Sequence, residues 1–320
     1  MIRSKLSIPF FLMMLVSCGD RQAPVADAPL KTRWEAGAQT GKLDLLAVDL
    51  LASGQGWAVG DIEPAGQTAG SIFYTPDSGR NWQKIAEKTE IFEAVHFISA
   101  TRGWIAGYAG RIERTDDGGR TWKIQRVERE GEVLNALFFL DQNRGWVVGG
   151  GGIIFRTVNG GDAWEIVPTG RVEDLWDVRF SSPDRGWIVG EDGLVLATTD
   201  GGATWAAQSS GTNRALFGLA LPSETTVVAV GEAGTIIRSE DGVSWAAVDS
   251  KTGESLNSVA SAGPGIVWAV GSRGATLGST DGGRSWSAAT AVVGRDLISV
   301  DFSDLARGVA VGQRGTVQLL

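Results

Sequence analysis

Few residues in this chain could carry out acid–base or nucleophilic chemistry. It contains one histidine, His96, one cysteine, Cys18, and two tyrosines, Tyr74 and Tyr108. A catalytic triad needs a base beside its nucleophile, and a zinc site draws most of its ligands from histidine and cysteine. A histidine-based triad and a multi-histidine metal site are therefore excluded unless His96 acts alone, and its place beside Phe97 predicts a structural role. We expect no metal and no cofactor.

The aspartates with the most regular spacing belong to a turn motif, Thr/Ser-x-Asp-x-Gly-x-Thr/Ser-Trp. In the copy from Thr115 to Trp122, Asp117 can accept backbone N–H bonds, glycine supplies positive φ and tryptophan fills the gap beside the hairpin. We predict a structural role for this position in every copy. Its occupants are Asp77, Asp117, Asn159, Asp200, Glu240 in a worn copy, and Asp281.

A second motif, Gly-Trp-x-x-Gly, recurs in step with the first and defines an internal repeat. Four full copies and three degenerate ones end at Gly60, Gly107, Gly149, Gly190, Gly231, Gly271 and Gly312, which are 40–47 residues apart. Each period holds segments for four strands, which is the content of one propeller blade. The repeat predicts an all-β, seven-bladed β-propeller over residues 31–320, with four antiparallel strands per blade.

The two ends of the repeat region complement each other. The seventh period stops after its third strand, Gly315–Leu320, whereas Arg33–Ala36 matches the fourth-strand segment Thr121–Ile124. We expect the N-terminal strand to complete the last blade, because this covers an otherwise exposed sheet edge. When the seven inner strands are aligned, one position has mostly small side chains, because seven strands that converge on one axis leave little room there. This small column consists of Ala47, Ala94, Ala136, Asp177, Gly218, Ser258 and Ser299.

A candidate binding face follows from this architecture. The loops between second and third strands share one face of a propeller with the loops between blades, and Trp176 stands near the start of its inner strand, where a funnel would open. An aromatic side chain with flanking arginines is a plausible binding anchor, although solvated charges and a buried tryptophan are the alternative. The predicted partner-binding residues are Arg126, Arg171, Trp176, Arg214, Arg273, Arg295 and Arg314. Four other arginines share one repeated position and are predicted to be blade architecture: Arg102, Arg144, Arg185 and Arg307.

The N-terminus reads as an export signal. Its apolar run, Leu6–Val16, is too short to span a bilayer, and Leu15–Cys18 resembles the lipobox of bacterial lipoproteins. This resemblance implies that residues 1–17 are removed and that Cys18 is lipidated, with a simple secretory signal as the alternative. Residues 18–30 are predicted to be a flexible tether. We expect an exported protein anchored at the bacterial membrane and facing the periplasm, with the outer membrane favoured by Gly19, or the thylakoid or plasma membrane in a cyanobacterium.

Charge and motif content also bear on the class of function. A net charge of -8 and a pI near 4.9 argue against a nucleic-acid partner. The aspartate turn resembles the Asp-box of sialidase-like propellers, which implies an arginine triad, a tyrosine nucleophile and a glutamate partner. Tyr74 precedes an Asp-box on the wrong side of a blade, and Tyr108 has no evident glutamate partner in the sequence. We therefore expect no enzymatic activity.

The combined string from Arg102 to Trp122 resembles the photosystem II stability/assembly factor-like propellers, and the resemblance covers about residues 31–320. It implies a non-catalytic scaffold that binds early photosystem II intermediates, in part through an arginine patch, and that is lipid-anchored in cyanobacteria. The expected partner is a photosystem II intermediate in a phototroph, and another membrane protein or envelope complex elsewhere. The alternative is a carbohydrate-binding or sialidase-like glycoside hydrolase propeller.

Overall fold

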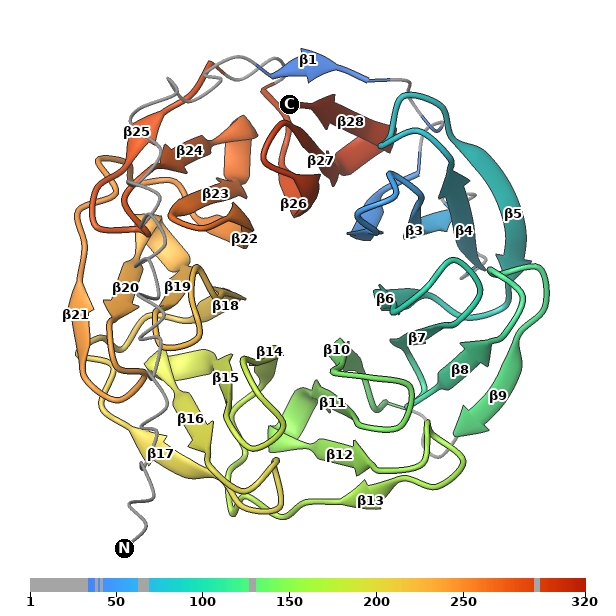
Figure 1. Ribbon diagram of the computed structural model, residues 1–320, viewed down its shortest axis with the longest axis horizontal. Coiled ribbons are helices and arrows are strands. Elements are labelled where there is room, and N and C mark those ends of the chain that lie inside the picture. The colour runs from blue at the N-terminus through green and yellow to red at the C-terminus, as the bar shows by residue number, and fades with distance from the viewer. Residues whose placement is uncertain (1–33, 38–39, 41–42, 63–68, 127–130, 291–293) are drawn as a thin grey trace, which may run out of the picture. The chain divides into compact units, whose positions relative to one another are not determined.

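Short turns between consecutive strands let each repeat fold locally into an antiparallel meander. Seven such four-stranded sheets stand around a common axis, with one edge strand of each sheet nearest the axis (Figure 1). The structure, a computed structural model, describes residues 34–37, 40, 43–62, 69–126, 131–290 and 294–320, all within the unit Lys31–Leu320. This confirms the predicted seven-bladed, all-β propeller. The predicted signal peptide and tether lie outside the described residues.

The blades are numbered in chain order. Blade 1 contains β2 (Leu45–Leu50), β3 (Gly56–Ile62), β4 (Ala69–Thr75) and β5 (Gln83–Lys88); blade 2 contains β6 (Phe92–Phe97), β7 (Gly103–Gly107), β8 (Ile112–Thr115) and β9 (Lys123–Arg126). Blade 3 contains β10 (Leu134–Phe139), β11 (Gly145–Gly149), β12 (Ile154–Thr157) and β13 (Glu165–Ile166); blade 4 contains β14 (Leu175–Phe180), β15 (Gly186–Gly190), β16 (Val195–Thr198) and β17 (Ala206–Gln208). Blade 5 contains β18 (Leu216–Ala220), β19 (Val227–Gly231), β20 (Ile236–Ser239) and β21 (Trp245–Ala247); blade 6 contains β22 (Leu256–Gly263), β23 (Ile266–Gly271), β24 (Thr276–Ser279) and β25 (Ser287–Ala288). Blade 7 contains β26 (Leu297–Asp304), β27 (Arg307–Gly312), β28 (Thr316–Leu319) and, outermost, β1 (Glu35–Ala36). Short 3₁₀ turns join the second and third strands of blades 3 to 7: η1 (Gly150–Gly152), η2 (Glu191–Gly193), η3 (Glu232–Gly234), η4 (Ser272–Gly274) and η5 (Gln313–Gly315).

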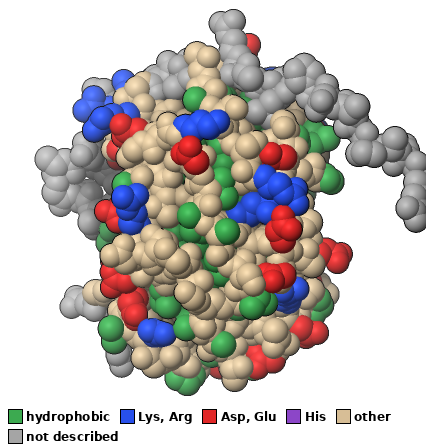
Figure 2. All heavy atoms as spheres, turned by 90° about the vertical axis from the view of Figure 1, so that its left-hand side faces the viewer, with side chains coloured by type: hydrophobic (Ala, Val, Ile, Leu, Met, Phe, Trp, Pro, Cys, Tyr) green, Lys and Arg blue, Asp and Glu red, His purple; other side chains and the backbone are tan. Residues whose placement is uncertain are grey.

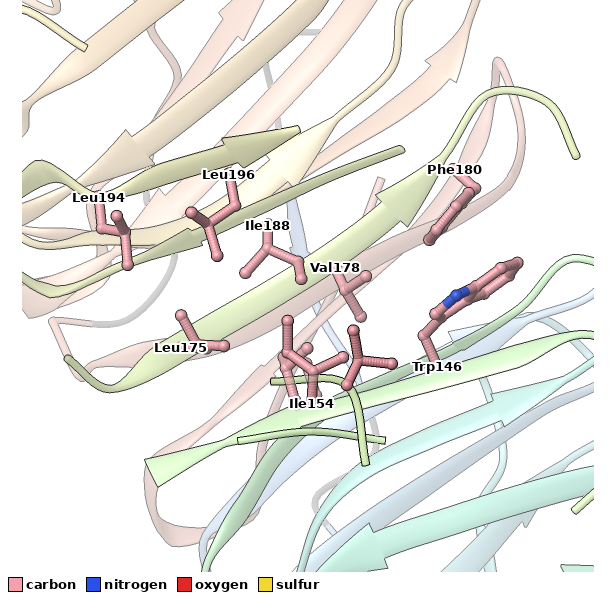
Figure 3. Packing of buried hydrophobic residues seen from close by; sticks show 11 residues of the cluster. Trp146, Ile154, Leu175, Val178, Phe180, Ile188, Leu194 and Leu196 are labelled. Atoms are coloured by element: carbon pink, nitrogen blue, oxygen red, sulfur yellow. The ribbon is translucent and has the colours of Figure 1, made fainter. Parts of the chain in front are cut away.

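The hydrophobic core lies between neighbouring blades. Around blades 3 and 4, Ile154 of β12 and Val178 of β14 are buried in one cluster (Figure 3). In the same cluster Trp146 of β11 stacks on Phe180 of β14, with ring centroids 3.6 Å apart. The same stacking joins earlier pairs of blades through Trp57 on Phe97 at 3.6 Å and Trp104 on Phe139 at 3.5 Å. Each Gly-Trp motif therefore packs its blade against the inner strand of the next.

The tryptophan of the Gly-Trp motif also ties its blade to the next Asp-box. The indole N–H of Trp57 donates to the carbonyl of Gly118 at 3.0 Å. Equivalent bonds run from Trp104 to Gly160 (3.2 Å), from Trp146 to Gly201 (3.2 Å) and from Trp187 to Gly242 (2.8 Å). A buried indole N–H needs an acceptor. The two motifs recur in step because one supplies the donor and the other the acceptor on the neighbouring blade.

The N-terminal strand closes the ring, as predicted. β1 pairs antiparallel with β28, with Glu35 opposite Leu319 and Ala36 opposite Gln318. The side chain of Trp34 is 1% exposed and meets Trp268 of blade 6 edge to face, with ring centroids 5.6 Å apart. Arg33, which was predicted to belong to this strand, lies outside the described residues.

Hydrogen bonds within the Asp-boxes hold the turn between third and fourth strands. In blade 2, Asp117 Oδ1 accepts the N–H of Thr121 at 2.8 Å, and the Thr115 hydroxyl accepts the N–H of Gly119 at 2.9 Å. The side-chain oxygens of four further residues accept the corresponding N–H four positions on: Asp77, Asn159, Asp200 and Asp281. The turn thus uses the acid as an acceptor for backbone groups.

Blade 5 departs from the predicted alignment, which places Glu240 in the acid position. Asp241 occupies that position instead, and its Oδ1 accepts the N–H groups of Val243 and Ser244, each at 2.8 Å. Glu240 pairs with the exposed Arg284 and with the buried guanidinium of Arg238, each at 2.8 Å. The prediction was wrong because this copy of the motif is one residue shorter than the others, so the acid stands one residue nearer its tryptophan.

Replacing Asp241 by alanine is expected to destabilise the protein, because two backbone N–H groups of the turn lose their acceptor. Glu240→Ala is the control: the side chain is 63% exposed, surface ion pairs contribute little, and Arg238 keeps its bond to the Gly282 carbonyl at 2.7 Å. Urea unfolding should show a drop in the transition midpoint for Asp241→Ala that is several times the drop for Glu240→Ala. Equal drops would contradict the assignment of Asp241.

Candidate functional site

Two sets of loops meet on one face of the propeller, which we call the funnel face. It consists of the turns between second and third strands and of the segments that lead from one blade into the next. The first backbone N–H of each 3₁₀ turn donates to the carbonyl of the residue that directly precedes the inner strand of the same blade. Gly150 donates in this way to Val133 (3.0 Å), and Glu191 donates to Asp174 (2.9 Å). Backbone hydrogen bonds therefore join the two sets of loops on the same face of the propeller.

Aspartates that precede inner strands tie these turns to the next blade. Their Oδ1 atoms accept N–H groups of the preceding blade in three pairs: Asp174 from Gly151 (2.7 Å), Asp296 from Arg273 (2.8 Å) and Asp44 from Arg314 (2.7 Å). Arg273 and Arg314 adopt left-handed φ values of 53° and 54°, which is unfavourable for residues other than glycine. The carboxylates offset this cost. Sequence reasoning missed these aspartates, although each directly precedes the leucine that starts an inner strand.

One side chain from each blade lines a funnel at the axis. All of them hold the second position of an inner strand: Leu46, Glu93, Asn135, Trp176, Phe217, Asn257 and Ile298. The small column that follows, from Ala47 of blade 1 to Ser299 of blade 7, lines the same cavity of about 460 Å³. The small residues therefore leave the funnel open.

The side chains at the funnel mouth differ in polarity from blade to blade. Trp176 is half-buried and meets Phe217 of blade 5 edge to face, with ring centroids 5.9 Å apart. Asn135 and Asn257 use their amide N–H groups to bridge to the next blade, where they donate to the carbonyls of Leu175 (2.9 Å) and Leu297 (2.8 Å). Both asparagines also line the cavity. Glu93 is the charged member of this ring.

Deeper in the funnel, a basic group is neutralised by its neighbour. Arg179 Nη1 lies 2.9 Å from Asp177 Oδ1. The second oxygen of Asp177 accepts the N–H of Leu219 in blade 5 at 2.9 Å. Asp177, the largest member of the small column, thus joins blades 4 and 5 and pairs with the arginine.

A side groove of about 630 Å³ shares Glu93, Asn135 and Trp176 with the funnel. It also contains Tyr108, whose side chain is exposed, and Asp174. Tyr108 therefore shares a groove with a glutamate that the sequence did not point to. No arginine is among the described residues that line this groove.

The predicted binding arginines surround the funnel instead of lining it. Arg171 pairs with Glu173 at 3.3 Å, and Arg273 pairs with Glu254 at 3.0 Å. The remaining three also lie on this face, with Arg214 and Arg314 exposed and Arg295 half-buried. Acids lie on the same face, among them Glu191, Asp192 and Glu232 in the 3₁₀ turns, so it does not form a patch of one sign.

Arg126 departs from the prediction that it binds a partner. Its side chain is only 8% exposed, because the guanidinium pairs with Glu132 at 2.8 Å and lies 3.8 Å from the centroid of the Phe155 ring. A similar internal network lies nearby, where Glu113, 1% exposed, pairs with Lys88 (2.5 Å) and Arg111 (2.6 Å). Both networks join neighbouring blades or segments. Arg126 is therefore part of the blade architecture.

The four arginines at one repeated position lie toward the face opposite the funnel; three pair within their own blade, and Arg185 of blade 4 reaches blade 5. Their partners are Asp116 for Arg102 (2.8 Å), Asp141 for Arg144 (2.6 Å), Asp304 for Arg307 (2.5 Å) and the Asp241 carbonyl for Arg185. Figure 2 shows basic and acidic side chains interspersed on the outer side of the ring as well. Neither the opposite face nor the outer side of the ring therefore shows a patch of one charge sign in the described residues.

His96 lies on the inner strand β6, where its ring joins three blades. Its Nδ1 lies 3.1 Å from Asp49 Oδ1, and its Nε2 lies 3.0 Å from the carbonyl of Phe139. The described residues contain no group of three histidine, cysteine, aspartate or glutamate side chains arranged to hold a metal. In the same part of the chain, no helix is long and apolar enough to cross a bilayer.

The fold and the funnel define a class: a seven-bladed propeller of Asp-box repeats with an open, largely uncharged funnel on one face. The family model described as "Photosynthesis system II assembly factor YCF48" matches residues 78–172 and 167–252. The chain belongs to this family. Because the family is one of assembly factors, its membership supports the expectation that the chain is not an enzyme.

Solved structures share the fold. A structure of YCF48 bound to a D1 peptide superposes with a TM-score of 0.73 at 20% identity, covering 92% of this chain and 98% of that one. YCF48 from Cyanidioschyzon merolae gives 0.71 at 20% identity, covering 90% and 98%. The GH74 enzyme of Niastella koreensis gives 0.68 at 15% identity, covering 89% of this chain and 53% of that one. A comparison with curated proteins finds no match.

Proposed function

We propose that this protein is a non-catalytic, lipid-anchored assembly factor that binds a segment of a membrane protein on its funnel face. In an organism with photosystem II, that segment belongs to D1 or another photosystem II intermediate. Elsewhere it belongs to another membrane protein or envelope complex. Family membership supports the role of an assembly factor, and the relative bound to a D1 peptide supports a peptide as the ligand.

The observation that carries the proposal is the funnel with its side groove. Together they offer aromatic rings, amide oxygens and carboxylates in a concave surface that one extended segment can occupy. Binding sites of this kind combine apolar walls with a few polar groups that fix orientation. The surrounding arginines, Arg171, Arg214 and Arg295, add charged contacts at the rim.

The direction of the first strand supports the anchoring part of the proposal. Trp34 and Glu35 lie beside the end of β28, and Thr40 donates to the Gly315 carbonyl on the funnel face at 3.4 Å. The chain therefore enters the propeller at the Asp-box face and runs toward the funnel face. The described part of the propeller thus begins, at Trp34, on the face opposite the funnel.

The test is a pull-down of native membranes, together with a binding titration of a D1 peptide, using the charge reversals Arg171→Glu, Arg214→Glu and Arg295→Glu in one chain. We expect this variant to lose most of the captured membrane protein and to bind the peptide at least about tenfold more weakly, because three rim contacts reverse sign. The matched control reverses three exposed arginines on the Asp-box face, Arg80, Arg120 and Arg284. Unchanged capture by the first variant, or equal loss in both, would reject the rim as a contact surface.

A carbohydrate ligand is the second candidate, favoured by the fold likeness to GH74 enzymes and by the aromatic pair Trp176 and Phe217. Aromatic rings beside amide oxygens also suit a sugar. A panel of glycans and chromogenic glycosides separates the two candidates. Saturable glycan binding that Trp176→Ala abolishes would favour the carbohydrate, and a flat response across the panel would remove it.

A further inference from the structure

The side groove connects the funnel with a further hollow on blade 3. The funnel and the side groove share Asn135 and Trp176 in their linings. The side groove in turn shares Gly150 and Gly151 with a hollow of about 480 Å³, which reaches Ile166 of the outermost strand β13 (Figure 1). We call this hollow the edge groove. The three hollows therefore form one path from the axis of the propeller to the outer edge of blade 3.

The path crosses the turn η1, which presents no side chain at its first two positions, Gly150 and Gly151. The structure describes the equivalent turns of blade 2 and of blades 4 to 7, and each of them has a long side chain at one or both positions. These side chains are Tyr108, Glu191, Asp192, Glu232, Arg273, Gln313 and Arg314. Blade 3 therefore has open space where these other blades place a side chain.

Neither packing nor backbone geometry requires glycine at these two positions. A Cβ added at Gly151 would meet no atom within 4 Å, and one added at Gly150 would lie at an ordinary 3.4 Å from Asp174 Oδ1. Gly151 has a left-handed φ of 66°, but Ala233 and Arg273 keep a left-handed φ of 50° and 53° at the same position of their blades. The fold alone therefore does not explain the missing side chains. Bare backbone permits another chain to approach closely.

The glycine turn does not offer free donors for an anion. The N–H of Gly150 donates to the Val133 carbonyl at 3.0 Å, and the N–H of Gly151 donates to Asp174 Oδ1 at 2.7 Å. A turn that binds phosphate or another anion directs such N–H groups toward the ligand. The crossing therefore suits a neutral chain better than an anionic group.

The edge groove itself combines apolar surface with charges that are already paired. The side chain of Ile166 is 62% exposed and lines the groove. The two charged residues of the lining are both in ion pairs, Glu132 with Arg126 at 2.8 Å and Arg171 with Glu173 at 3.3 Å. A groove of this kind favours a neutral, apolar occupant.

Exposed apolar side chains gather on the same part of the propeller. Seven large apolar side chains are exposed among the described residues, and two of them, Val243 of blade 5 and Leu305 of blade 7, lie elsewhere. The other five belong to blades 2 and 3 or to the segment that follows blade 3: Tyr108, Ile124, Val158, Ile166 and Val172. Exposed apolar groups that gather on one side of a protein mark an interaction surface.

We infer that the partner segment leaves the funnel across the glycine turn of blade 3 as an extended, neutral stretch, with an apolar side chain against Ile166. This inference rests on the proposed role as an assembly factor that binds a segment on the funnel face. It adds the route of the segment and the chemistry of the stretch that crosses the turn. Because side chains alternate in direction along an extended chain, the stretch carries apolar residues at alternate positions.

The first test closes the crossing in the full chain. Gly150→Gln combined with Gly151→Ala introduces residue types that other blades have at these positions, as in Gln313 and Ala233, so the variant should fold. We expect it to bind the D1 peptide at least about tenfold more weakly in calorimetry, because a side chain obstructs the path. The matched control is Glu232→Gln, which gives the turn of blade 5 the same pair of residue types outside the path. It should keep the wild-type affinity.

The second test concerns the apolar contact. Ile166→Ser should weaken binding of the D1 peptide about fivefold or more, because the buried apolar area is lost. Ile124→Ser is the matched control, since Ile124 is 56% exposed at the equivalent position of blade 2 and does not line the edge groove. A five-residue peptide of alternating valine and alanine should also shift the backbone amide resonance of Gly151 saturably. The same peptide with lysine or glutamate in place of valine should bind more weakly.

Each outcome decides the inference, and unchanged melting temperatures show that the variants are folded. Wild-type affinity for the D1 peptide in both groove variants would overturn the route and leave the proposed function in place. Equal or tighter binding of the lysine or glutamate peptide would overturn the neutral chemistry. A dimer of the wild type that the glycine-turn variant abolishes in sedimentation would assign the groove to a second copy of the chain instead. If the wild type captures neither the D1 peptide nor any membrane protein, the proposed function fails, and the response of Gly151 to the valine peptide still decides whether the groove binds an apolar segment.

Discussion

A chain that lacks residues 31–40 is expected to lose its cooperative unfolding transition near the wild-type temperature. The deletion removes β1, which pairs with β28, and it also removes the N–H of Gly37 that donates to the Val317 carbonyl at 2.9 Å. Blade 7 would then expose the edge of its third strand, and the ring would lose its closing contacts. Circular dichroism during heating measures the loss.

The side chain of Trp34 carries much of this effect. It is 1% exposed and meets Trp268 at 5.6 Å and Phe302 at 6.1 Å, both edge to face. Truncating a buried aromatic side chain of this kind to alanine costs about 3–5 kcal/mol. Trp34→Ala should therefore reproduce a large part of the destabilisation without shortening the chain.

The matched control for the deletion removes ten residues, 21–30, from the segment predicted to be a tether. It should leave the unfolding transition unchanged. A 31–40 deletion that melts like the wild type would show that the ring does not depend on closure by β1.

Stability is expected to fall as the pH rises from about 5 to 8, because three channel residues on inner strands take up protons more readily in the folded protein. Burial, and then the nearby Asp49 carboxylate, raise the pKa of Asp301 to about 7. Burial also raises the pKa of Asp177, although Arg179 opposes the shift. Asp301 alone should account for a loss of roughly 2–3 kcal/mol across this range, and the other two residues add to it, measured as unfolding free energy in urea.

His96 acts in the same direction. Its Nε2 faces the Phe139 carbonyl, which can only accept, and its Nδ1 faces the Asp49 carboxylate. Burial opposes the charged ring, but the Asp49 carboxylate and the hydrogen bonds outweigh it and raise the pKa of His96 above its ordinary value of 6.5. A raised histidine pKa stabilises the fold fully below that ordinary value and loses its effect as the pH rises through the folded pKa.

The direction in which the acids change stability with pH follows from the same coupling between proton binding and folding. An acid whose pKa is raised from 3.8 to about 7 binds its proton more tightly when folded, so folding becomes less favourable as the pH passes through that window. The Asp-box acids act oppositely at lower pH: hydrogen bonds from Thr121 and Thr204 lower the pKa values of Asp117 and Asp200 to about 2. Their contribution is present above the ordinary value and is lost in acid. Stability should therefore be greatest near pH 5.

Asp301→Asn tests the assignment. The amide oxygen can still accept the N–H of Leu50, which Asp301 Oδ2 accepts at 2.7 Å, and the charge facing Asp49 is removed. We expect this variant to be more stable than the wild type at pH 8 and to show a flatter profile between pH 5 and 8. Asp304→Asn, on the same strand but paired at the surface with Arg307, is the control and should keep the wild-type slope. A wild-type slope in Asp301→Asn would contradict the account.

The sequence by itself determined the fold and its closure. Each blade forms from strands that are neighbours in the chain, so the evidence for it is local: the Gly-Trp motif, the Asp-box and their spacing. The incomplete seventh period and the extra strand at Trp34 then required the ends to meet. The ring of mouth residues, including Trp176, could also be read from the alignment, because equivalent positions in a symmetric ring point to the same axis.

Only the tertiary structure decided which charged side chains remain available on the funnel face. Arg126 looked like a rim residue, but Glu132 and Phe155 bury it. Asp177 of the small column accepts the N–H of Leu219 in the next blade, and Asp49 meets His96 of the next blade. These pairings cross from one sheet to the next, and they depend on the rotation between blades. A repeat determines that neighbouring blades pack together, whereas the partner of each long polar side chain is set by the space that the packed blades leave.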